Sequence, residues 1–327
     1  MKISSLKNYL DVDIYGDTDY EVFSFSSIDN PEKQTIIYVS DIRLINIENI
    51  EKYGAVLIKN KYKDSLINGM NFLLVDDIAS SLSIISKLLH NEPTIPICNN
   101  KKKFEEVIFS EDVKIGINVK IGKGCRIGSN VVIEDNVTIG ENTYLDHNVV
   151  IKHNSLIGDN CGVGPGTIIG SEGFGNLKDK SNIWHHIKHS GNVILKDNIT
   201  IGANCTIDRA TFDSTIIDHG VIIDNQVHIA HNVFIGENTA IAAKVGIAGS
   251  CVIGKRNMLG GMVGIIDHVN TVDDVIVSAT STVYKDIKEP GIYTGILPIS
   301  KHVVWKRIAL WITKLDKIAK LLDIKNK

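Results

Sequence analysis

The sequence predicts a mainly β protein built around a parallel β-solenoid, with a small α/β domain before it and a helix after it. Three observations lead to this fold class. Aliphatic residues recur at every sixth position, Gly often follows them directly, and small or β-branched residues recur four positions later. A sustained period of six is typical of a solenoid, because each repeat supplies one short strand and one corner. The aliphatic positions are Ile115, Ile121, Ile127, Ile133, Ile139, Leu145, Ile151, Ile157, Val163 and Ile169, then Leu195, Ile201 and Ile207, then Ile217, Ile223, Ile229, Ile235, Ile241, Ile247, Ile253, Leu259 and Ile265.

Three such repeats close a triangular coil of about 18 residues, and coils stack at the parallel-strand spacing of about 4.8 Å. We expect the aliphatic side chain to point inward and the following Gly to supply backbone freedom at a corner. Four of the five cysteines share the small position, so we expect buried thiols that fill a narrow core and neither a disulfide nor a metal site. Regular hexapeptides of this kind resemble the left-handed parallel β-helix, and the handedness is taken from that resemblance.

Residues 1–97 lack the repeat and predict a small α/β domain. The expected strands are Thr35–Val39, Ala55–Ile58 and Phe72–Val75. A helix is expected over 78–89, where apolar residues follow helical spacing behind Asp76 or Asp77 as the N-cap.

Residues 98–112 are expected to form a linker, as the last part of a Pro- and Lys-containing stretch that begins at Asn91. The solenoid is expected over 113–287, with a long excursion at Ser171–Asn192 and a four-residue insertion near Arg209–Asp213. Loops extruded from a rigid scaffold often carry binding residues, although they can equally be tolerated insertions.

Residues 288–327 are expected to form a helical extension whose apolar stripe needs cover, either from self-association or from its own coils. Residues 300–327 also carry six more positive than negative charges, which leaves the remainder at about −9. This asymmetry indicates an acidic partner or an anionic surface.

The net charge of −3 gives no general case for nucleic-acid binding. We expect no signal peptide, and this sequence has no apolar run of 18 residues and an odd number of cysteines, five. We therefore expect a reduced, cytoplasmic protein.

The segment around His231 is the candidate for chemistry. Gly249 lies 18 residues later, so the two positions should stack on adjacent coils. A base beside an unpaired backbone N–H is an arrangement suited to acyl transfer, because the N–H can stabilise the oxyanion that forms. Asp224 lies one repeat plus one residue earlier, where a carboxylate could orient the imidazole. His268, two coils plus one residue after His231, should lie roughly 10 Å along the axis and could grip another part of one extended ligand.

Two other interpretations stay open at this point. The histidines could be solvated or could pack at a subunit interface. Alternatively, His228 and His231 could join a third ligand across a trimer interface to hold a metal, as in hexapeptide-type carbonic anhydrases, although no third ligand is in clear register.

Seven motifs stand out in the sequence, namely Gly170–Gly175, Thr206–Arg209, Ile222–Gln226, Ile229–Val233, Ala248–Ser250, Glu289–Tyr293 and Val304–Lys306. Together they resemble one family over nearly the whole chain and in the family's order, the UDP-3-O-acylglucosamine N-acyltransferases of lipid A biosynthesis.

The resemblance implies a homotrimer of left-handed β-helices with active sites between neighbours. It implies transfer of a 3-hydroxyacyl group from the phosphopantetheine arm of acyl carrier protein to the 2-amine of UDP-3-O-(3-hydroxyacyl)-glucosamine. No bound cofactor, metal or covalent enzyme intermediate is implied. By motif match, His231 would be the general base and Gly249 the oxyanion donor, while Asp224 would assist His231 or hold the sugar. The substrate-binding residues would be His268, Asn225, Gln226, Asn232 and Tyr38.

Tyr38 is the only aromatic residue in the segment 37–43, and Arg43 stands where the family usually has Tyr. The acidic carrier protein would contact Lys285, Lys306 and Arg307, whereas a peripheral contact with the inner membrane would use the same basic end. The small side chains of Val277–Thr282 could line a groove for the acyl chain. The alternative functions are an acetyl-CoA-dependent nucleotide-sugar N-acetyltransferase and a non-catalytic trimeric scaffold.

Overall fold

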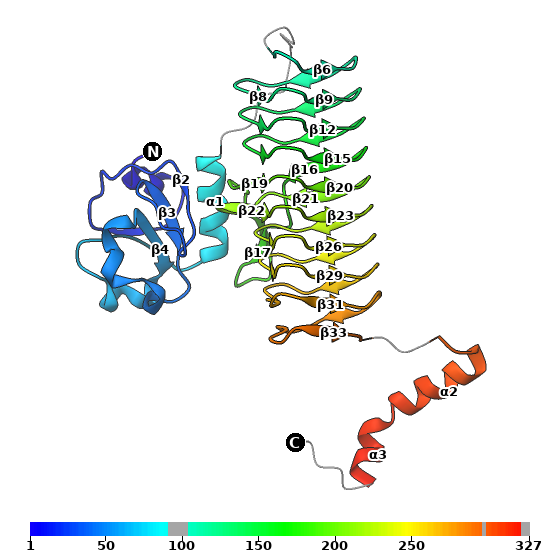
Figure 1. The fold of residues 1–327 in the computed structure, drawn as a ribbon. Helices are drawn as coiled ribbons and strands as arrows, with labels where there is room; N and C mark the ends of the chain where they lie inside the picture. The colour runs from blue at the N-terminus through cyan, green and yellow to red at the C-terminus, as the bar shows by residue number, and fades with distance from the viewer. Residues whose placement is uncertain (91–103, 296–298, 322–327) are drawn as a thin grey trace. The chain divides into compact units, whose positions relative to one another are not determined.

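The structure is a computed structural model that describes residues 1–90, 104–295 and 299–321 (Figure 1). It divides into a compact unit, Met1–Thr294, and a second unit, Gly295–Lys327. The segment Asn91–Lys103, most of the stretch predicted as a linker, lies outside the described residues.

The N-terminal part contains one mixed five-stranded sheet in the order β1-β5-β4-β3-β2, with helix α1 after the last strand. Its strands are β1 (Asp13–Tyr15), β2 (Ser24–Phe25), β3 (Thr35–Tyr38), β4 (Ala55–Lys59) and β5 (Asn71–Val75). Its helices are α1 (Ile78–Leu89) and the short 3₁₀ helices η1 (Ile3–Asn8), η2 (Ile42–Leu44), η3 (Ile47–Lys52) and η4 (Asn60–Ser65). The predicted strands and helix are thus confirmed, and Asp77 caps α1 by accepting from the amides of Ala79 and Ser80.

The rest of the first unit is a parallel β-helix whose short strands form three sheets (Figure 1). The nine-stranded sheet contains β7 (Lys114–Ile115), β10 (Val132–Ile133), β13 (Val150–Ile151), β16 (Ile168–Ser171), β21 (Thr206–Asp208), β24 (His228–Ile229), β27 (Gly246–Ile247), β30 (Gly264–Ile265) and β32 (Thr282–Val283). The seven-stranded sheet contains β8 (Lys120–Ile121), β11 (Thr138–Ile139), β14 (Leu156–Ile157), β19 (Asn192–Leu195), β22 (Ser214–Ile217), β25 (Phe234–Ile235) and β28 (Val252–Ile253). The ten-stranded sheet contains β6 (Ile108–Phe109), β9 (Arg126–Ile127), β12 (Tyr144–Leu145), β15 (Gly162–Val163), β20 (Thr200–Ile201), β23 (Ile222–Ile223), β26 (Ala240–Ile241), β29 (Met258–Leu259), β31 (Val275–Val277) and β33 (Gly291–Tyr293).

The predicted repeat register is confirmed by the core. The aliphatic residue of each repeat pairs with its copy one coil further on and forms one continuous buried cluster. The cysteines at the small position, Cys125, Cys161, Cys205 and Cys251, are buried and free. Burial raises the pKa of each of these thiols, which keeps them protonated and inert.

The glycine that follows the aliphatic residue serves a different purpose from the predicted one. At Gly116 a Cβ would lie 2.4 Å from Asp135 Oδ1 and 2.6 Å from the Asp135 amide nitrogen, so the next coil excludes it. Backbone freedom is needed two residues later. There Asn118 and its copies Asn136 and Asn154 have φ of 56°, 58° and 62°, in the left-handed region that Asn tolerates.

The solenoid extends beyond the predicted 113–287 at both ends, because β6 pairs with β9 and β33 pairs with β31. The division of the chain into domains at the predicted boundaries stays a prediction.

The excursion after Ser171 contains the hairpin β17 (Asn176–Lys178) and β18 (Trp184–His186). This hairpin contacts the N-terminal part, where Ser83 Oγ donates to the His186 carbonyl at 2.7 Å.

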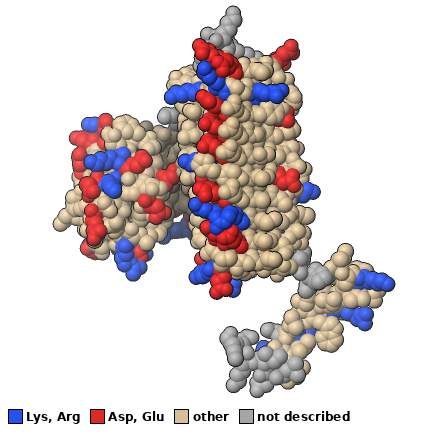
Figure 2. Space-filling model, viewed as in Figure 1, with Lys and Arg blue, Asp and Glu red and all other residues tan. Residues whose placement is uncertain are grey.

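Charged side chains on the visible face of the solenoid gather in a column along its length, beside a largely uncharged face formed by the ten-stranded sheet (Figure 2).

The second unit contains α2 (His302–Ile312) and α3 (Leu315–Leu321), where the sequence predicts a single helix. Leu322, part of the predicted apolar stripe, lies outside the described residues. Among the helices that the structure describes, none has both the length and the apolar character needed to cross a membrane.

Candidate active site

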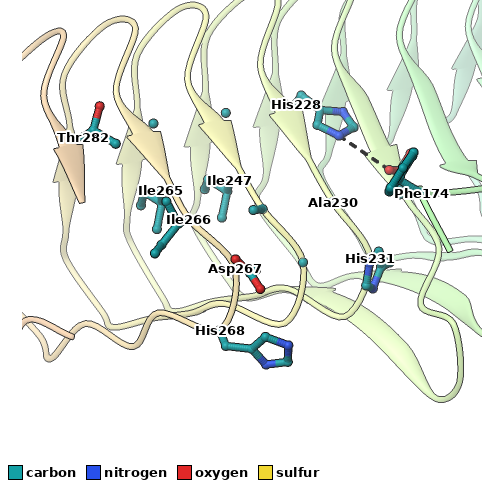
Figure 3. A pocket seen from close by; sticks show the side chains of 15 residues that line it. Phe174, His228, Ala230, His231, Ile247, Ile265, Ile266, Asp267, His268 and Thr282 are labelled. Atoms are coloured by element: carbon teal, nitrogen blue, oxygen red, sulfur yellow. Dashed lines mark ion pairs between the residues drawn. The ribbon is translucent and has the colours of Figure 1, made fainter. Parts of the chain in front are cut away.

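A cavity of about 610 Å³ opens on the nine-stranded sheet, where the coils leave β24, β27 and β30 (Figure 3). Its wall brings together residues from five successive coils and from the excursion after Ser171. They are Phe174, Asp208, His228, Ala230, His231, Gly246, Ile247, Ala248, Gly249, Gly264, Ile265, Ile266, Asp267, His268 and Thr282. Three of the predicted site residues, His231, Gly249 and His268, therefore share one cavity.

His231 and Gly249 are vertical neighbours on adjacent coils. The His231 carbonyl accepts from the amide of Ser250 at 3.0 Å, and a Cβ at Gly249 would lie 2.7 Å from His231 Nε2. The imidazole thus occupies the space that a side chain at residue 249 would need. Only glycine fits this position without displacing the ring.

The amide of Gly249 is open. At equivalent corners elsewhere the amide donates to a side chain one coil further on, as Ile117 does to Asp135 and Lys255 does to Asp273. For the Gly249 amide no acceptor is recorded among the described residues, so this N–H is available to a ligand oxygen.

The tautomer of His231 follows from its neighbours. Asn232 Nδ2 donates to the Phe212 carbonyl at 2.8 Å, and Asn232 Oδ1 accepts from the Thr211 amide at 2.9 Å, which fixes the orientation of the amide group. The same Oδ1 lies 3.2 Å from His231 Nδ1. Nδ1 therefore carries the ring proton and donates it to Asn232, which leaves the lone pair of Nε2 free to act as a base.

The insertion that carries Thr211 is anchored by Arg209. This guanidinium is buried and donates to the carbonyls of Gly170 and His153 at 2.8 and 3.0 Å. His153 in turn contacts Glu134 at 3.1 Å. Burial alone would raise the pKa of Glu134, but hydrogen bonds from His153 and Lys152 hold it at about 2. The four-residue insertion is thus a fixed support beside His231.

Asp224 does not meet His231 within the chain. It follows β23 in the ten-stranded sheet, and its Oδ1 accepts from the backbone and side-chain nitrogens of Asn225 at 2.7 and 2.8 Å. Asn225 Oδ1 accepts from the Ala203 amide at 2.7 Å, and Gln226 holds a corner with φ of 59°. Asp224, Asn225 and Gln226 together form a corner that does not line the cavity.

His268 lies further along the same cavity (Figure 3). It occupies a corner with φ of 59°, and its amide donates to the Gly249 carbonyl at 3.0 Å. This bond ties the coil that carries His268 to the coil that carries the open amide.

The sequence pattern predicts no role for Asp208 of the cavity wall or for His189, which lies beside His231. Asp208 ends β21 and is 4% exposed, and its Oδ2 lies 3.6 Å from His228 Nε2. Burial raises the pKa of Asp208, and the charges of His228 and His231 oppose that rise. The only sequence signal was the motif Thr206–Arg209, which carries no sign that its carboxylate would face a cavity.

His189, from the excursion after Ser171, packs against His231 with ring centroids 5.4 Å apart at an interplanar angle of 75°. Its Nδ1 donates to the Ile187 carbonyl at 3.1 Å, and its buried Nε2 has no recorded partner among the described residues. Burial, aided by His231, lowers the pKa of His189 to about 4. A neutral ring at this place leaves His231 free of a second positive charge.

The glycines of β27 and β30 open a trough along the sheet. His228, Gly246, Gly264 and Thr282 lie in register on successive coils. A Cβ at Gly246 would meet nothing within 4 Å, and one at Gly264 would have Thr282 Cγ2 as its nearest neighbour at 3.8 Å. Packing within the chain does not require glycine at these positions, so the missing side chains leave space for a ligand.

The other predicted binding residues are not among those that line this cavity. Tyr38 ends β3 and is half-buried, and burial raises the pKa of its hydroxyl. Arg43 is paired with Asp41. Lys285 is exposed in the first unit, and Lys306 and Arg307 are exposed on α2 in the second. From the segment Val277–Thr282, Thr282 lines the cavity, whereas Val277 is buried and Ala279 lines a separate apolar cavity of about 360 Å³.

Comparison with known proteins agrees with this architecture. Residues 107–140 and 136–171 match the family model for the bacterial transferase hexapeptide (six repeats). The UDP-N-acetylglucosamine acyltransferase of Francisella novicida superposes with a TM-score of 0.51 and 25% identity, over 58% of this chain and 67% of that one. The class of protein is therefore a hexapeptide-repeat transferase.

One relative shows the family, and a second matches this chain over about half of its length. The UDP-3-O-acylglucosamine N-acyltransferase of Campylobacter lari is 35% identical over 309 residues, which cover 93% of this chain and 95% of the relative. The enzyme of the same name from Vesicomyosocius okutanii is 49% identical over 160 residues, or 49% of this chain and 48% of the relative. The chain thus spans about half the length of this and several other relatives that it matches. The chain belongs to the family of UDP-3-O-acylglucosamine N-acyltransferases.

Proposed function

We propose that the protein transfers a 3-hydroxyacyl group from acyl carrier protein to the 2-amine of UDP-3-O-(3-hydroxyacyl)-glucosamine, in the cytoplasmic steps of lipid A biosynthesis. The observation that carries the proposal is the pair formed by His231 Nε2 and the open amide of Gly249 in one cavity. Family membership supplies the substrate class, through the Campylobacter lari relative.

In the proposed reaction the nitrogen lone pair attacks the thioester carbonyl carbon, and a C–N bond forms. The oxygen becomes an oxyanion that accepts a hydrogen bond from the Gly249 amide, an interaction typically worth a hundredfold or more in rate. His231 Nε2 takes the proton from the nitrogen, with Nδ1–H held by Asn232. When the intermediate collapses, the C–S bond breaks and the leaving thiolate takes the proton from Nε2. His231 is then ready for the next cycle.

The trough over Gly246 and Gly264 supports a long acyl chain over a two-carbon one. It begins at the reacting end of the cavity and runs toward Thr282, three strand spacings or about 14 Å from His228. An acetyl-CoA-dependent N-acetyltransferase would leave most of this apolar space empty. Purified protein offered a mixture of acetyl-CoA and 3-hydroxyacyl carrier proteins should yield the long-chain amide alone by mass spectrometry. An acetylated product would favour the alternative.

The proposed assembly is a homotrimer. One stripe on the outside of the ten-stranded sheet is formed by four residues in register, Ile222, Ala240, Met258 and Ile276. This sheet forms the largely uncharged face in Figure 2. Ile222 and Met258 are 57% and 54% exposed, so this stripe is a candidate for burial against another copy. In such an assembly, Asp224 and Tyr38 of one subunit could serve the cavity of the next. Light scattering of the full chain, compared with Ile222→Lys, tests the interface.

The proposed donor partner is acidic, and Lys285, Lys306 and Arg307 offer exposed positive charge to it. Steering between opposite charges weakens with salt. The Michaelis constant for the acyl carrier protein should therefore rise with ionic strength, and more steeply in the native chain than in Lys306→Glu/Arg307→Glu. If these residues instead serve a membrane surface, the chain will sediment with anionic vesicles and the Michaelis constant will not respond to salt.

A further inference from the structure

The carboxylate of Asp208 is almost fully buried and poorly satisfied. Its residue is 4% exposed, yet among the described residues no hydrogen bond to either of its oxygens is recorded. The nearest cationic group is His228 Nε2 at 3.6 Å, drawn as the dashed line from His228 in Figure 3. That separation is too long for a hydrogen bond. Buried carboxylates are normally paired or hydrogen-bonded, because leaving one unmatched is costly.

The missing partner must approach from the cavity. Asp208 lines the same wall as His231 and Gly249. On its other side it faces Gly173, where a Cβ would lie 3.1 Å from Asp208 Oδ2. His228 is half exposed and can turn aside or hold its present place when a ligand enters. A group with N–H bonds in the cavity would supply the hydrogen bond that the protein itself does not.

We propose that Asp208 makes this cavity selective for an amine over a hydroxyl as the acceptor. A neutral primary amine has two N–H bonds and one lone pair. One N–H donates to Asp208, the other donates to His231 Nε2, and the lone pair points at the thioester carbon. The subsite rests on the proposed function, since it takes the attacking nitrogen of that reaction.

A hydroxyl cannot satisfy the same arrangement. It has a single O–H, which must go to His231 if the oxygen is to be activated, and Asp208 then stays buried without a donor. A site built to hydrogen-bond an N–H rejects an analogue that lacks it far more strongly than a hydrophobic pocket rejects a small change in shape. Asp208 is thus a specificity-determining residue for N-acylation, and the proton removed in the reaction still goes to His231.

The experiment compares two acceptors, UDP-3-O-(3-hydroxyacyl)-glucosamine and the corresponding UDP-3-O-(3-hydroxyacyl)-glucose, which carries a 2-hydroxyl. Calorimetry on the full chain measures the dissociation constant of each at pH 8, without donor. The native protein should prefer the amine by tenfold or more. Asp208→Asn should lower that preference about tenfold, mostly through weaker binding of the amine sugar. The hydroxyl sugar should still bind, because the amide nitrogen of Asn can donate to a hydroxyl oxygen. Retained binding of the hydroxyl sugar shows that the variant is folded.

Asp267→Asn is the matched control, because it removes an exposed carboxylate from the same cavity and should leave the preference unchanged. Equal weakening of both sugars in Asp208→Asn, or an equal loss of preference in Asp267→Asn, would overturn the selectivity proposal. An unchanged preference in Asp208→Asn would overturn it as well. If the native protein bound neither sugar nucleotide, the proposed function itself would fail, which is a separate result.

Discussion

The imidazole of His231 lies so close to Gly249 that a Cβ at residue 249 would stand 2.6 Å from its Cε1. Two features of the candidate site therefore depend on one glycine. The missing side chain makes room for the ring of the base, and it leaves the neighbouring amide uncovered. Because adjacent strands of a parallel sheet are about 4.8 Å apart, a base and an open N–H on successive coils sit at a spacing suited to one reacting carbonyl.

Gly249→Ala should lower turnover by a hundredfold or more while the fold stays intact. The added methyl displaces the imidazole and crowds the approach to the amide, so both the base and the oxyanion donor are disturbed. Gly162→Ala is the control, since a Cβ there would meet nothing within 4 Å and residue 162 lies on another sheet. Steady-state kinetics and thermal melting of both variants check this. Full activity in Gly249→Ala would contradict the geometry of the pair.

Asn232→Gly should reduce kcat about ten- to a hundredfold, because Nδ1 of His231 loses the acceptor that fixes its tautomer. Glycine keeps the corner unstrained at φ of 60°. Asn238→Gly makes the same exchange at φ of 55° on the next corner, which does not line the cavity, and should leave kcat unchanged. A pH–rate profile should also broaden or shift in Asn232→Gly alone. Identical behaviour of the two variants would show that Asn232 has only a corner role.

The free energy of unfolding should fall at acidic pH because of the buried His189. Its pKa in the folded protein is lowered to about 4 from 6.5, so the unfolded chain binds more protons between these values. The stabilisation is present above pH 6.5 and is lost as the pH falls toward 4. Between pH 6.5 and 4.5 the free energy of unfolding should drop by about 2 kcal/mol more in the native protein than in His189→Asn.

Denaturant unfolding at a series of pH values measures this difference, with His219→Asn as a control because the His219 side chain is 47% exposed. If His189→Asn lost as much stability as the native protein over that range, the buried neutral imidazole would not be its source.

Bulk at Thr282 should shorten the preferred acyl chain, because this side chain stands in register at the far end of the trough over Gly246 and Gly264. Thr282→Met should shift the product distribution from a mixed pool of acyl donors toward shorter chains. Thr138→Met, at the same repeat position on the seven-stranded sheet, should leave the distribution unchanged. Mass spectrometry of the products decides, and an unaltered distribution in Thr282→Met would remove this residue as the limit on chain length.

The period of six was sufficient to predict the coil, because the inward position of each repeat is set by arithmetic alone. The same arithmetic placed Gly249 next to His231. It could not explain why Gly follows the aliphatic residue, since the clash at Gly116 comes from the coil below and not from its own φ. The left-handed corners fall instead on residues such as Asn118, so the abundant asparagines have a structural role.

The positions of residues in the two interruptions of the repeat could not be predicted from the sequence. His189 and Phe174 come from the excursion after Ser171, and Thr211 comes from the short insertion, where no period fixes the path of the chain. Asp208 sits in the repeat, but Gly173 of that excursion lies against its carboxylate, a contact that no period predicts. The position of Asp224 beside His231 within one chain was not met, because a count of seven residues crosses a corner and leads to a different sheet. Its role in the site stays a prediction.

The most direct test of the central claim is the turnover of His231→Ala, measured as amide formation from 3-hydroxyacyl carrier protein and UDP-3-O-(3-hydroxyacyl)-glucosamine. If Nε2 of this ring removes the proton of the attacking amine, turnover should fall by two or more orders of magnitude, while sugar-nucleotide binding and the assembly state stay as in the native protein. Turnover close to the native value would contradict the claim.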